Sequence, residues 1–580
     1  MFVLPRGWLS LVLGCVIALC GLGSVARAGG GPETLILVVN SRSQASMAVA
    51  NYFVELRKIP STNICYVDWK GSTEETDIET FRTAILTPVL KFVEQRGLAP
   101  HLDGIIYSSD FPYRITFDKD LPKEALQRGD LAKAQSGSIT GLTYLWQQVL
   151  AKDPRYVYFD TNRYHRFDNS GQPLPTHGFR GWYGWSEDNQ LLESGGRRYF
   201  LSTMLGVTGG RGNTPNEVIK SLQRSASADG TAPEGSFWYS DNGDVRATTR
   251  KPLFEPAVAE LTKLGFKAGI IQAVSPEDSK NCMGVMLGSA TFDWPRSRST
   301  LLAGSLADNL TSYGADFSNP PIKGNMNQTP ISEFIRYGAS GSAGTPSEPT
   351  AMAMKFPDAF LFVHYVRGAS LAEAFYQSVR GPYQLLVVGD PLCQPYAKIP
   401  TIAVAGFTAD QTVKGEITLT PTATGGEGTV DRYSLYVDGV QTAICGQGDS
   451  LKLDTAAYSD GSHEIRVVGV SDDAIETQGR LILPLEFSNH DRKIQLTATP
   501  ANVRLGQKVT FAAESPGAST IVLHYNGRPL GQIKGAKGEI SVNTAYFGMG
   551  PVNVRAVAIT DGAVKTTAWA KPVQIQATDR

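Results

Sequence analysis

The chain has no excess of either charge: among 580 residues, 54 are Lys or Arg and 55 are Asp or Glu, giving a net charge of -1. This balance creates no long-range field that would draw the protein to nucleic acid or to an acidic membrane. Only 19% of the residues are charged and 42% are hydrophobic, so the chain can bury large cores. We expect a globular protein without a nucleic-acid partner.

Cysteine is also scarce. Two of the six cysteines lie near the amino terminus, and the others are Cys65, Cys282, Cys393 and Cys445. None of these four belongs to a CxxC pair or has the histidine spacing of a structural zinc site, so the sequence predicts no metal. Four thiols allow three disulfide pairings, and the sequence does not choose among them. We expect buried free thiols.

Common nucleotide-binding and hydrolase motifs are missing. No P-loop occurs, no G-x-G-x-x-G fingerprint follows the first predicted strand, and neither Ser289 nor Ser305 lies in a G-x-S-x-G elbow. The acidic stretch at 241–244 lacks the spacing of an EF-hand, and we interpret it as a tight turn. The sequence therefore predicts no cofactor.

Long apolar runs are confined to the amino terminus. Arg6 precedes an apolar run at 9–22, and Ala26-Arg27-Ala28 has the pattern of a signal-peptidase site. The run is shorter than the roughly 20 residues that span a bilayer, although a retained anchor is the alternative. We predict a signal peptide at 1–28 and export to the periplasm, the cell surface or the medium. No transmembrane span is expected after cleavage.

Strand and helix patterns alternate from residue 29 to about 398, where we expect the first domain. A continuous apolar run at 35–39 is typical of a buried parallel strand, and an amphipathic helix at 47–57 and a short strand at 64–67 follow. The alternation recurs at 81–95 with 105–108 and at 253–264 with 267–273. It predicts an open, mostly parallel α/β sheet with helices on both faces and an insertion around 120–200.

The end of this domain carries clear helix and strand signals. Thr329 and Pro330 predict the start of a helix that Gly338 ends, and a strand of small residues is expected at 339–345. Ser370 and Glu373 have the spacing of a capping box. A last strand at 385–388 leads into a Gly-Asp-Pro turn.

After residue 398 the pattern changes to short alternating strands, as in antiparallel sandwiches. The turns Asp438-Gly439 and Asn526-Gly527 lie 88 residues apart, and the pairs Thr455 with Thr544 and Arg466 with Arg555 lie 89 apart. Two tandem immunoglobulin-like sandwiches are therefore predicted at 399–489 and 490–580. We expect few contacts between them and the first domain.

The first domain resembles an uncharacterised family of exported bacterial proteins from species that carry exosortase, a sorting enzyme. The matching stretches are VVNSRSQASMAVANYFVELRKIP (38–60), NIC (63–65), SSDFPYRI (108–115), GSLADNLTSYGADF (304–317), TPISEFIRYGASGSAGTPSEP (329–349) and LLVVGDPLCQPY (385–396). The resemblance implies a link to exosortase sorting systems and gives no activity.

A more distant likeness is to gingipain-type cysteine peptidases, which have a caspase-like fold and also end in a GDP-like turn. In those enzymes a Gly-His-Gly loop supplies the base, and a cysteine after the next strand supplies the nucleophile. Here the equivalent loop has Tyr313 in place of the histidine, and no cysteine occurs between Cys282 and Cys393. Since the chemistry needs a thiolate beside an imidazole, the likeness implies a domain without this dyad.

Polar residues follow several of the predicted strands. In an open parallel sheet, ligands gather outside the carboxyl ends of the strands. The residues expected there form our candidate cleft: Asn40, Ser41, Asp110, Asp308, Ser312, Tyr313, Ser342, Glu348 and Asp390. Such carboxylates and hydroxyls could serve as acid and base, but the same residue types also cap helices and stabilise turns.

A segment at 156–199 interleaves arginines with Tyr, Phe and Trp and contains His177 in an HG dipeptide. Such a surface could stack on sugars or bind an anionic polymer, whereas the alternative is a lid packed on the edge of the sheet. We interpret His177 as part of an insertion loop.

These observations favour an exported cell-envelope protein with a non-catalytic gingipain-like domain on immunoglobulin-like modules. Two alternatives stay open. One is an envelope hydrolase that uses carboxylates such as Asp308 and Glu348, and the other is a surface protein that binds a carbohydrate or another envelope polymer. A protein partner in the envelope is also compatible with the sequence.

Overall fold

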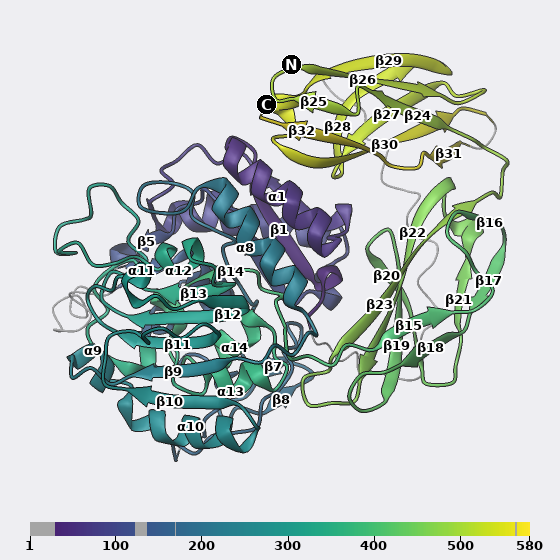
Figure 1. Ribbon diagram of the computed structural model, residues 1–580. Coiled ribbons are helices and arrows are strands. Elements are labelled where there is room, and N and C mark those ends of the chain that lie inside the picture. The colour runs from purple at the N-terminus through teal and green to yellow at the C-terminus, as the bar shows by residue number, and fades with distance from the viewer. Residues whose placement is uncertain (1–29, 122–135, 169, 563–564, 580) are drawn as a thin grey trace.

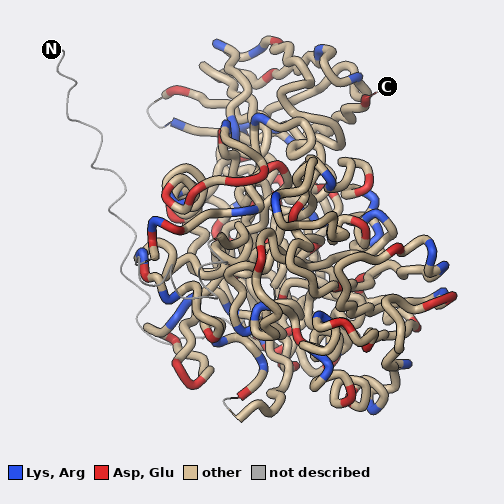
Figure 2. The backbone as a smooth tube through the Cα atoms, turned by 90° about the vertical axis from the view of Figure 1, so that its left-hand side faces the viewer, with Lys and Arg blue, Asp and Glu red and all other residues tan. Residues whose placement is uncertain are grey.

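The computed structural model describes residues 30–121, 136–168, 170–562 and 565–579, and Figure 1 shows an α/β part beside two β-sandwiches. The predicted signal peptide and a stretch of the predicted insertion lie outside the described residues. Within the described part of the chain, no helix is long and apolar enough to cross a membrane. Positively and negatively charged residues are interspersed along the backbone in Figure 2, as the balanced composition leads us to expect.

The α/β part contains the strands β1 (Leu35–Asn40), β2 (Ile64–Val67), β3 (Glu75–Asp77), β4 (Gly104–Tyr107), β5 (Arg114–Thr116), β6 (Ser136–Ser138), β7 (Gly184–Trp185), β8 (Leu191–Leu192), β9 (Ser236–Ser240), β10 (Lys267–Ile271), β11 (Cys282–Gly288), β12 (Leu301–Leu310), β13 (Gly341–Gly344) and β14 (Leu386–Gly389). Its helices are α1 (Gln44–Arg57), α2 (Ile78–Thr80), α3 (Thr87–Gln95), α6 (Ile139–Tyr144), α7 (Trp146–Leu150), α8 (Pro215–Ala228), α9 (Val245–Thr248), α10 (Phe254–Lys263), α11 (Trp294–Ser297), α12 (Ser332–Arg336), α13 (Leu361–Val366) and α14 (Leu371–Gln377).

Two sets of parallel strands meet in this part. The first set has the order β2-β1-β4, and the second has the order β10-β9-β11-β12-β13 followed by β14. Residues 201–204 bridge them, since Tyr107 pairs in parallel with Met204 and Met204 pairs in parallel with Val388 of β14. Because β14 is antiparallel to β13, the two sets run in opposite senses. In Figure 1, β1 crosses β9, β11 and β12 steeply, as sheet twist requires.

Local signals explain several helix boundaries. Ser43 caps α1 by accepting a hydrogen bond from the Ser46 N–H, and Ser370 and Glu373 form the predicted capping box of α14. The predicted start of α12 at Thr329 is wrong, because the helix begins at Ser332. The Thr329 hydroxyl instead accepts a hydrogen bond from the Phe292 N–H, which fixes a neighbouring loop.

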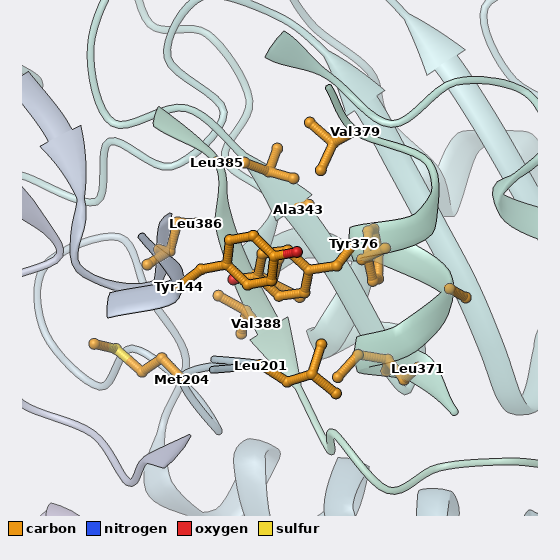
Figure 3. Close-up of a cluster of buried hydrophobic side chains, with 14 of the residues drawn as sticks. Tyr144, Leu201, Met204, Ala343, Leu371, Tyr376, Val379, Leu385, Leu386 and Val388 are labelled. Carbon is orange, nitrogen blue, oxygen red and sulfur yellow. The ribbon is translucent and has the colours of Figure 1, made fainter. Parts of the chain in front are cut away.

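A buried aromatic stack joins the two sets of strands. Figure 3 shows the rings of Tyr144 and Tyr376 stacked among side chains of β13 and β14, and their centroids lie 4.1 Å apart. On its other face Tyr144 stacks on Tyr199 at 4.6 Å. The Tyr376 hydroxyl donates to the backbone oxygen of Ser202, so the segment that bridges the sheet is also held by this core.

The carboxy-terminal part folds as two immunoglobulin-like sandwiches. The strands of the first are β15 (Thr401–Val404), β16 (Gln411–Val413), β17 (Glu416–Leu419), β18 (Pro421–Thr424), β19 (Val430–Val437), β20 (Val440–Gly446), β21 (Leu451–Asp454), β22 (Asp460–Ser471) and β23 (Gln478–Phe487). Those of the second are β24 (Gln495–Thr499), β25 (Asn502–Arg504), β26 (Lys508–Glu514), β27 (Thr520–Tyr525), β28 (Arg528–Lys534), β29 (Lys537–Asn543), β30 (Gly550–Thr560), β31 (Thr566–Trp569) and β32 (Val573–Thr578).

The two predicted hairpin turns occur at equivalent places in the sandwiches. Asp438-Gly439 joins β19 to β20, Asn526-Gly527 joins β27 to β28, and all four residues have positive φ, as such tight turns require. The sandwiches also share one sheet, because Asp460 and Gly461 of β22 pair in parallel with Ala568 and Trp569 of β31.

The expectation of few contacts with the first domain is wrong. Arg466 of the first sandwich forms an ion pair with Glu33 at 2.9 Å, and both side chains are 1% exposed. In the second sandwich, the Tyr525 hydroxyl donates to the Asn51 Oδ1 atom of α1 at 2.5 Å. A sequence pattern marks where one fold ends, but it does not report how much surface the neighbouring folds bury against each other.

Candidate functional site

The predicted cleft does not form one edge of the sheet. Along the ladder, Val38 pairs with Tyr107, Tyr107 with Met204, Met204 with Val388 and Val388 with Ser342. Residues that follow β1 and β14 therefore lie at the edge of the sheet where β13 begins. Residues that follow β13 lie at the opposite edge, where β13 ends. The candidate residues fall into two groups because the two sets of strands run in opposite senses.

Asn40, Ser41 and Asp110 belong to the first group. The Asn40 side-chain amide donates to the backbone oxygen of Asp110 at 2.8 Å, and Ser41 donates to the backbone oxygen of Val67. The Asp110 carboxylate accepts hydrogen bonds from the hydroxyls of Ser43 and Thr208. These contacts tie the loops after β1 and β4 to the start of α1, which is the structural role that such residues often have.

Asp390 lies at the same edge of the sheet as Asn40 and Asp110, away from the carboxyl ends of β12 and β13. Its carboxylate is 1% exposed and pairs with Arg57, which also pairs with Asp229. Burial raises the pKa of Asp390, and the Arg57 guanidinium opposes that shift. The prediction that Asp390 shares an edge with Ser312 and Glu348 is wrong, because the strand that carries it is antiparallel to β13.

Asp308 is buried in the interior of the second set of strands. Its side chain is fully buried, and the Arg250 guanidinium pairs with it while also donating to the backbone oxygen of Pro357 at 3.1 Å. Burial raises the pKa of Asp308, and Arg250 opposes the shift. Ser342, in the middle of β13, is buried too, and no described residue hydrogen-bonds to its hydroxyl. Both side chains are closed off from solvent.

The ends of β12 and β13 bring together the rest of the candidate residues. The Thr345 hydroxyl, directly after β13, donates to the backbone oxygens of Thr311 and Ser312 at 3.2 and 3.1 Å. The Ala315 N–H donates to the backbone oxygen of Thr345 at 3.0 Å. These hydrogen bonds therefore join the loop after β12, which contains Tyr313, to Thr345 at the end of the next strand.

Tyr313 is partly buried in that loop. Its backbone N–H donates to the Gln328 side chain at 3.1 Å. Burial and the charges of Glu348 and Asp316 raise the pKa of the Tyr313 phenol. Glu348 accepts a hydrogen bond from the Thr350 N–H at 2.8 Å. A phenol with a raised pKa is a poor base at neutral pH, so this group of side chains offers no general base of the imidazole type.

The four cysteines within the described residues are free thiols, and Cys445 is only partly buried, whereas Cys65, Cys282 and Cys393 are buried. Burial raises the pKa of Cys65 and of Cys393 to about 12. Thiols with such pKa values stay protonated and unreactive at neutral pH. Among the described residues no group of three or more His, Cys, Asp or Glu side chains could hold a metal ion.

The aromatic segment at 156–199 is largely a packed lid. Tyr156, Tyr164, Tyr183 and Trp185 are buried, and Tyr158 is 52% exposed. Arginines of the segment are bound within the chain: Arg180 pairs with Glu476 of the first sandwich and Arg163 with Glu187. His177 hydrogen-bonds through Nδ1 to the backbone oxygen of Gly178 at 2.7 Å. Most of the rings that could stack on a sugar are thus used in the core.

Sequence reasoning missed Arg57, Arg250 and Thr345. The two arginines are buried counter-ions of carboxylates that lie far from them in the sequence, and no local pattern reports such a pairing. Thr345 stood at the end of the strand of small residues predicted at 339–345. That position was the available signal, because the residue after a strand lies beside the neighbouring loop.

Comparison with known proteins gives a family match for one region of the chain. The model of the bacterial Ig domain family matches residues 400–467, in the first sandwich. No curated protein sequence matches the chain.

Solved structures that resemble parts of the chain include the fibronectin(III)-like modules of CbhA from Clostridium thermocellum, at 12% identity, 30% of this chain, 95% of that chain and a TM-score of 0.14. SGBP-B of Bacteroides ovatus in complex with a mixed-linkage heptasaccharide matches at 12% identity, 31% of this chain, 47% of that chain and a TM-score of 0.19. Dimeric latent PorU from Porphyromonas gingivalis matches at 12% identity, 34% of this chain, 23% of that chain and a TM-score of 0.13. TM-scores this low establish no shared overall fold.

Proposed function

We propose that this chain is an exported cell-envelope protein whose gingipain-like α/β domain is non-catalytic. In this proposal, the two immunoglobulin-like modules hold the domain in a fixed orientation, and the domain serves as a structural or binding unit. The resemblance of six stretches of the sequence to proteins of exosortase-carrying species supports a role linked to that sorting system.

The observation that carries the proposal is which residues stand at the ends of β12 and β13. A cysteine peptidase needs a thiolate within hydrogen-bond reach of an imidazole there. Here Tyr313 occupies the loop after β12, and the Thr345 hydroxyl after β13 donates to two backbone oxygens. Since the Thr345 hydroxyl donates to backbone oxygens and not to a histidine or carboxylate, nucleophilic catalysis has no support at these positions.

Three of the candidate carboxylates are also engaged elsewhere. Asp308 and Asp390 are buried and paired with Arg250 and Arg57, and Asp110 binds two hydroxyls. A general acid and a general base must both reach one substrate atom. These three carboxylates instead serve as partners of groups within the chain, which favours a structural role over a catalytic one.

The test is to assay the mature full chain, beginning at Gly29, against a fluorogenic peptide library and against oligosaccharide substrates. We expect no turnover above that of buffer and no difference between the wild type and the variants Tyr313→Phe and Glu348→Gln. The exposed Tyr158→Phe variant is the matched control. Turnover that these two variants abolish and Tyr158→Phe leaves intact would show that the domain is an enzyme.

A second measurement tests export. Cell fractionation followed by amino-terminal sequencing should find the protein outside the cytoplasm, with its first residue at or near Gly29. Recovery of the intact amino terminus from the cytosol would contradict an envelope role.

A further inference from the structure

A cavity of about 500 Å³ lies where the α/β part and both sandwiches meet. Its wall includes Arg96 from the end of α3, Asp438 and Glu464 from the first sandwich, and His524 and Trp569 from the second. The volume lies within the range of about 300 to 1,000 Å³ that is usual for ligand sites, and such sites occur preferentially between domains.

Hydrogen bonds between each pair of modules fix this cavity. Thr62 donates to the backbone oxygen of Asp438 at 3.0 Å and joins the α/β part to the first sandwich. The Asn526 side chain donates to the Tyr66 hydroxyl at 3.0 Å and joins the α/β part to the second sandwich. Arg555 donates to Asp438 at 3.3 Å and joins the sandwiches. A ligand would meet a largely pre-formed wall, which reduces the entropy lost on binding.

One arginine of the cavity wall takes part in no ion pair with a carboxylate of the wall. Lys58 pairs with Glu55, Arg466 pairs with Glu464, and Arg555 pairs with Asp438. These pairs account for all three carboxylates of the wall. Arg96 is exposed and its guanidinium lies over the Phe92 ring, 5.3 Å from the centroid, but none of the ion pairs among the described residues includes it.

The surroundings of Arg96 add a positive field and neutral hydrogen-bonding groups. Arg96 lies against Gly527, and burial together with the charges of Arg555 and Arg96 lowers the pKa of the neighbouring His524. The wall also contains the side-chain amides of Asn526, Asn553 and Gln574. The indole ring of Trp569 lies 5.4 Å from the His524 ring and 4.8 Å from the Arg555 guanidinium, measured to the ring centroid.

We propose that this junction cavity binds an acidic saccharide of the uronic acid type. The carboxylate would bind Arg96 beside His524, the amides would hydrogen-bond to the hydroxyls, and a sugar ring would lie against Trp569. A guanidinium outside any ion pair selects a carboxylate, while three amides and an indole suit a polyhydroxylated ring better than a peptide. The proposal is independent of whether the α/β domain is catalytic.

The experiment is isothermal titration calorimetry on the mature full chain with tetragalacturonate, maltotetraose and tetraglutamate as probes. We expect tetragalacturonate to bind at least about tenfold more tightly than either of the other two, because only it combines carboxylates with sugar hydroxyls. The proposal is overturned if tetragalacturonate does not bind, if the neutral sugar binds equally well, or if the acidic peptide binds more tightly.

Two variants locate the site. Arg96→Gln should weaken the binding of tetragalacturonate about tenfold or more, since it removes a charged hydrogen-bond donor that is exposed and outside any ion pair. Lys91→Gln, on the same helix and outside the cavity, removes the same charge and should leave the affinity unchanged. Equal affinities of the Arg96→Gln variant and the wild type would overturn the assignment to this cavity.

Discussion

The two sandwiches carry an arginine at the same position of the repeat, but these residues differ in their surroundings. Arg466 is 1% exposed and pairs with Glu33 of the α/β part and with Glu464 of its own sandwich. Arg555 is 20% exposed, pairs with Asp438 and lies over the ring of Trp569. Both arginines line the junction cavity, but Arg466 also pairs with a carboxylate of the α/β part, whereas Arg555 pairs with one of the first sandwich. The surface that a repeat faces decides what its residues do.

The hairpin turns of the two repeats behave more alike. Asp438 accepts a hydrogen bond from Thr62, and Asn526 donates one to Tyr66, so both turns contact the short stretch around β2. The tight Asx-Gly turn is therefore one point at which each sandwich contacts the α/β part. The difference between the sandwiches lies in the neighbouring arginine, and the predictions below test how large that difference is.

The largest effect is expected for Arg466→Met. The substitution leaves the Glu33 carboxylate buried with only the more distant Arg480, at 3.5 Å, to compensate its charge. Breaking a buried pair from one side typically lowers the free energy of unfolding by about 3 to 5 kcal/mol. Urea unfolding followed by circular dichroism measures the change. If Arg466→Met lowered the free energy of unfolding by less than Arg555→Met does, the comparison between the two sandwiches would be reversed.

The next largest effect concerns Asp103, which lies beneath the first sandwich. Burial raises its pKa from 3.8 to about 7, and the charges of Glu373 and Glu476 add to that shift. The folded protein therefore holds a proton that the unfolded chain releases, so this contribution to stability is complete below pH 3.8 and is lost as the pH rises to about 7.

Asp103→Asn removes that dependence. At pH 8 we expect the variant to be more stable than the wild type by about 2 to 4 kcal/mol, and at pH 4 we expect the two to be nearly equal. Urea unfolding at both pH values measures this, with the exposed Asp118→Asn as the control. Equal stability of variant and wild type at pH 8 would contradict this prediction, because it would show that the buried, ionised Asp103 carboxylate does not destabilise the folded state.

A smaller effect is expected for Arg555→Met. Its ion pair with Asp438 is partly exposed, and Asp438 keeps a second partner in His463 at 2.6 Å. We expect the free energy of unfolding to fall by about 1 kcal/mol, which is typical of a partly solvated pair. The same urea titration gives the value. A loss as large as that of Arg466→Met would mean that both sandwiches are held in the same way.

The smallest effect concerns the thiols. Cys445 is the partly buried cysteine and belongs to the first sandwich, whereas Cys65, Cys282 and Cys393 are buried in the α/β part. Burial raises the pKa of Cys445, so labelling by iodoacetamide at neutral pH should be slow and should reach at most one equivalent. Mass spectrometry locates the label, and Cys445→Ser should abolish it. Rapid labelling of Cys282 or Cys393 in the native protein would reveal a reactive thiol that the structure gives no reason to expect.

Local patterns predicted many of the elements. The apolar run at 35–39 is the strand β1, the helix at 253–264 is α10, and the capping box of Ser370 and Glu373 begins α14. The bacterial Ig domain match at 400–467 supports the sandwich predicted there. Each of these features depends on burial periodicity, capping or turn geometry among residues that lie close together in the chain. The sequence alone therefore predicts them.

The candidate site was less predictable. The nine residues were assigned to one edge because the sheet was predicted to be mostly parallel and the strands that precede these residues were taken to run in the same sense. A single antiparallel pairing, of β14 with β13, separates Asn40, Asp110 and Asp390 from Tyr313 and Glu348. Strand direction depends on how distant segments pair, and no periodicity of the side chains along one strand records it.

The sequence by itself determined the turns at Asp438-Gly439 and Asn526-Gly527, the repeat of the sandwiches and the lack of any cysteine between Cys282 and Cys393, because residue identity and short spacing are enough for each. Only the tertiary structure decided that Asp308 and Asp390 are buried counter-ions, that Arg466 fastens one sandwich to the α/β part, and that Arg96 faces a cavity between three modules. Each of these depends on a partner tens or hundreds of residues away. Such partners are chosen by the free energy of burying charges and apolar surface together, and that energy is a property of the folded chain.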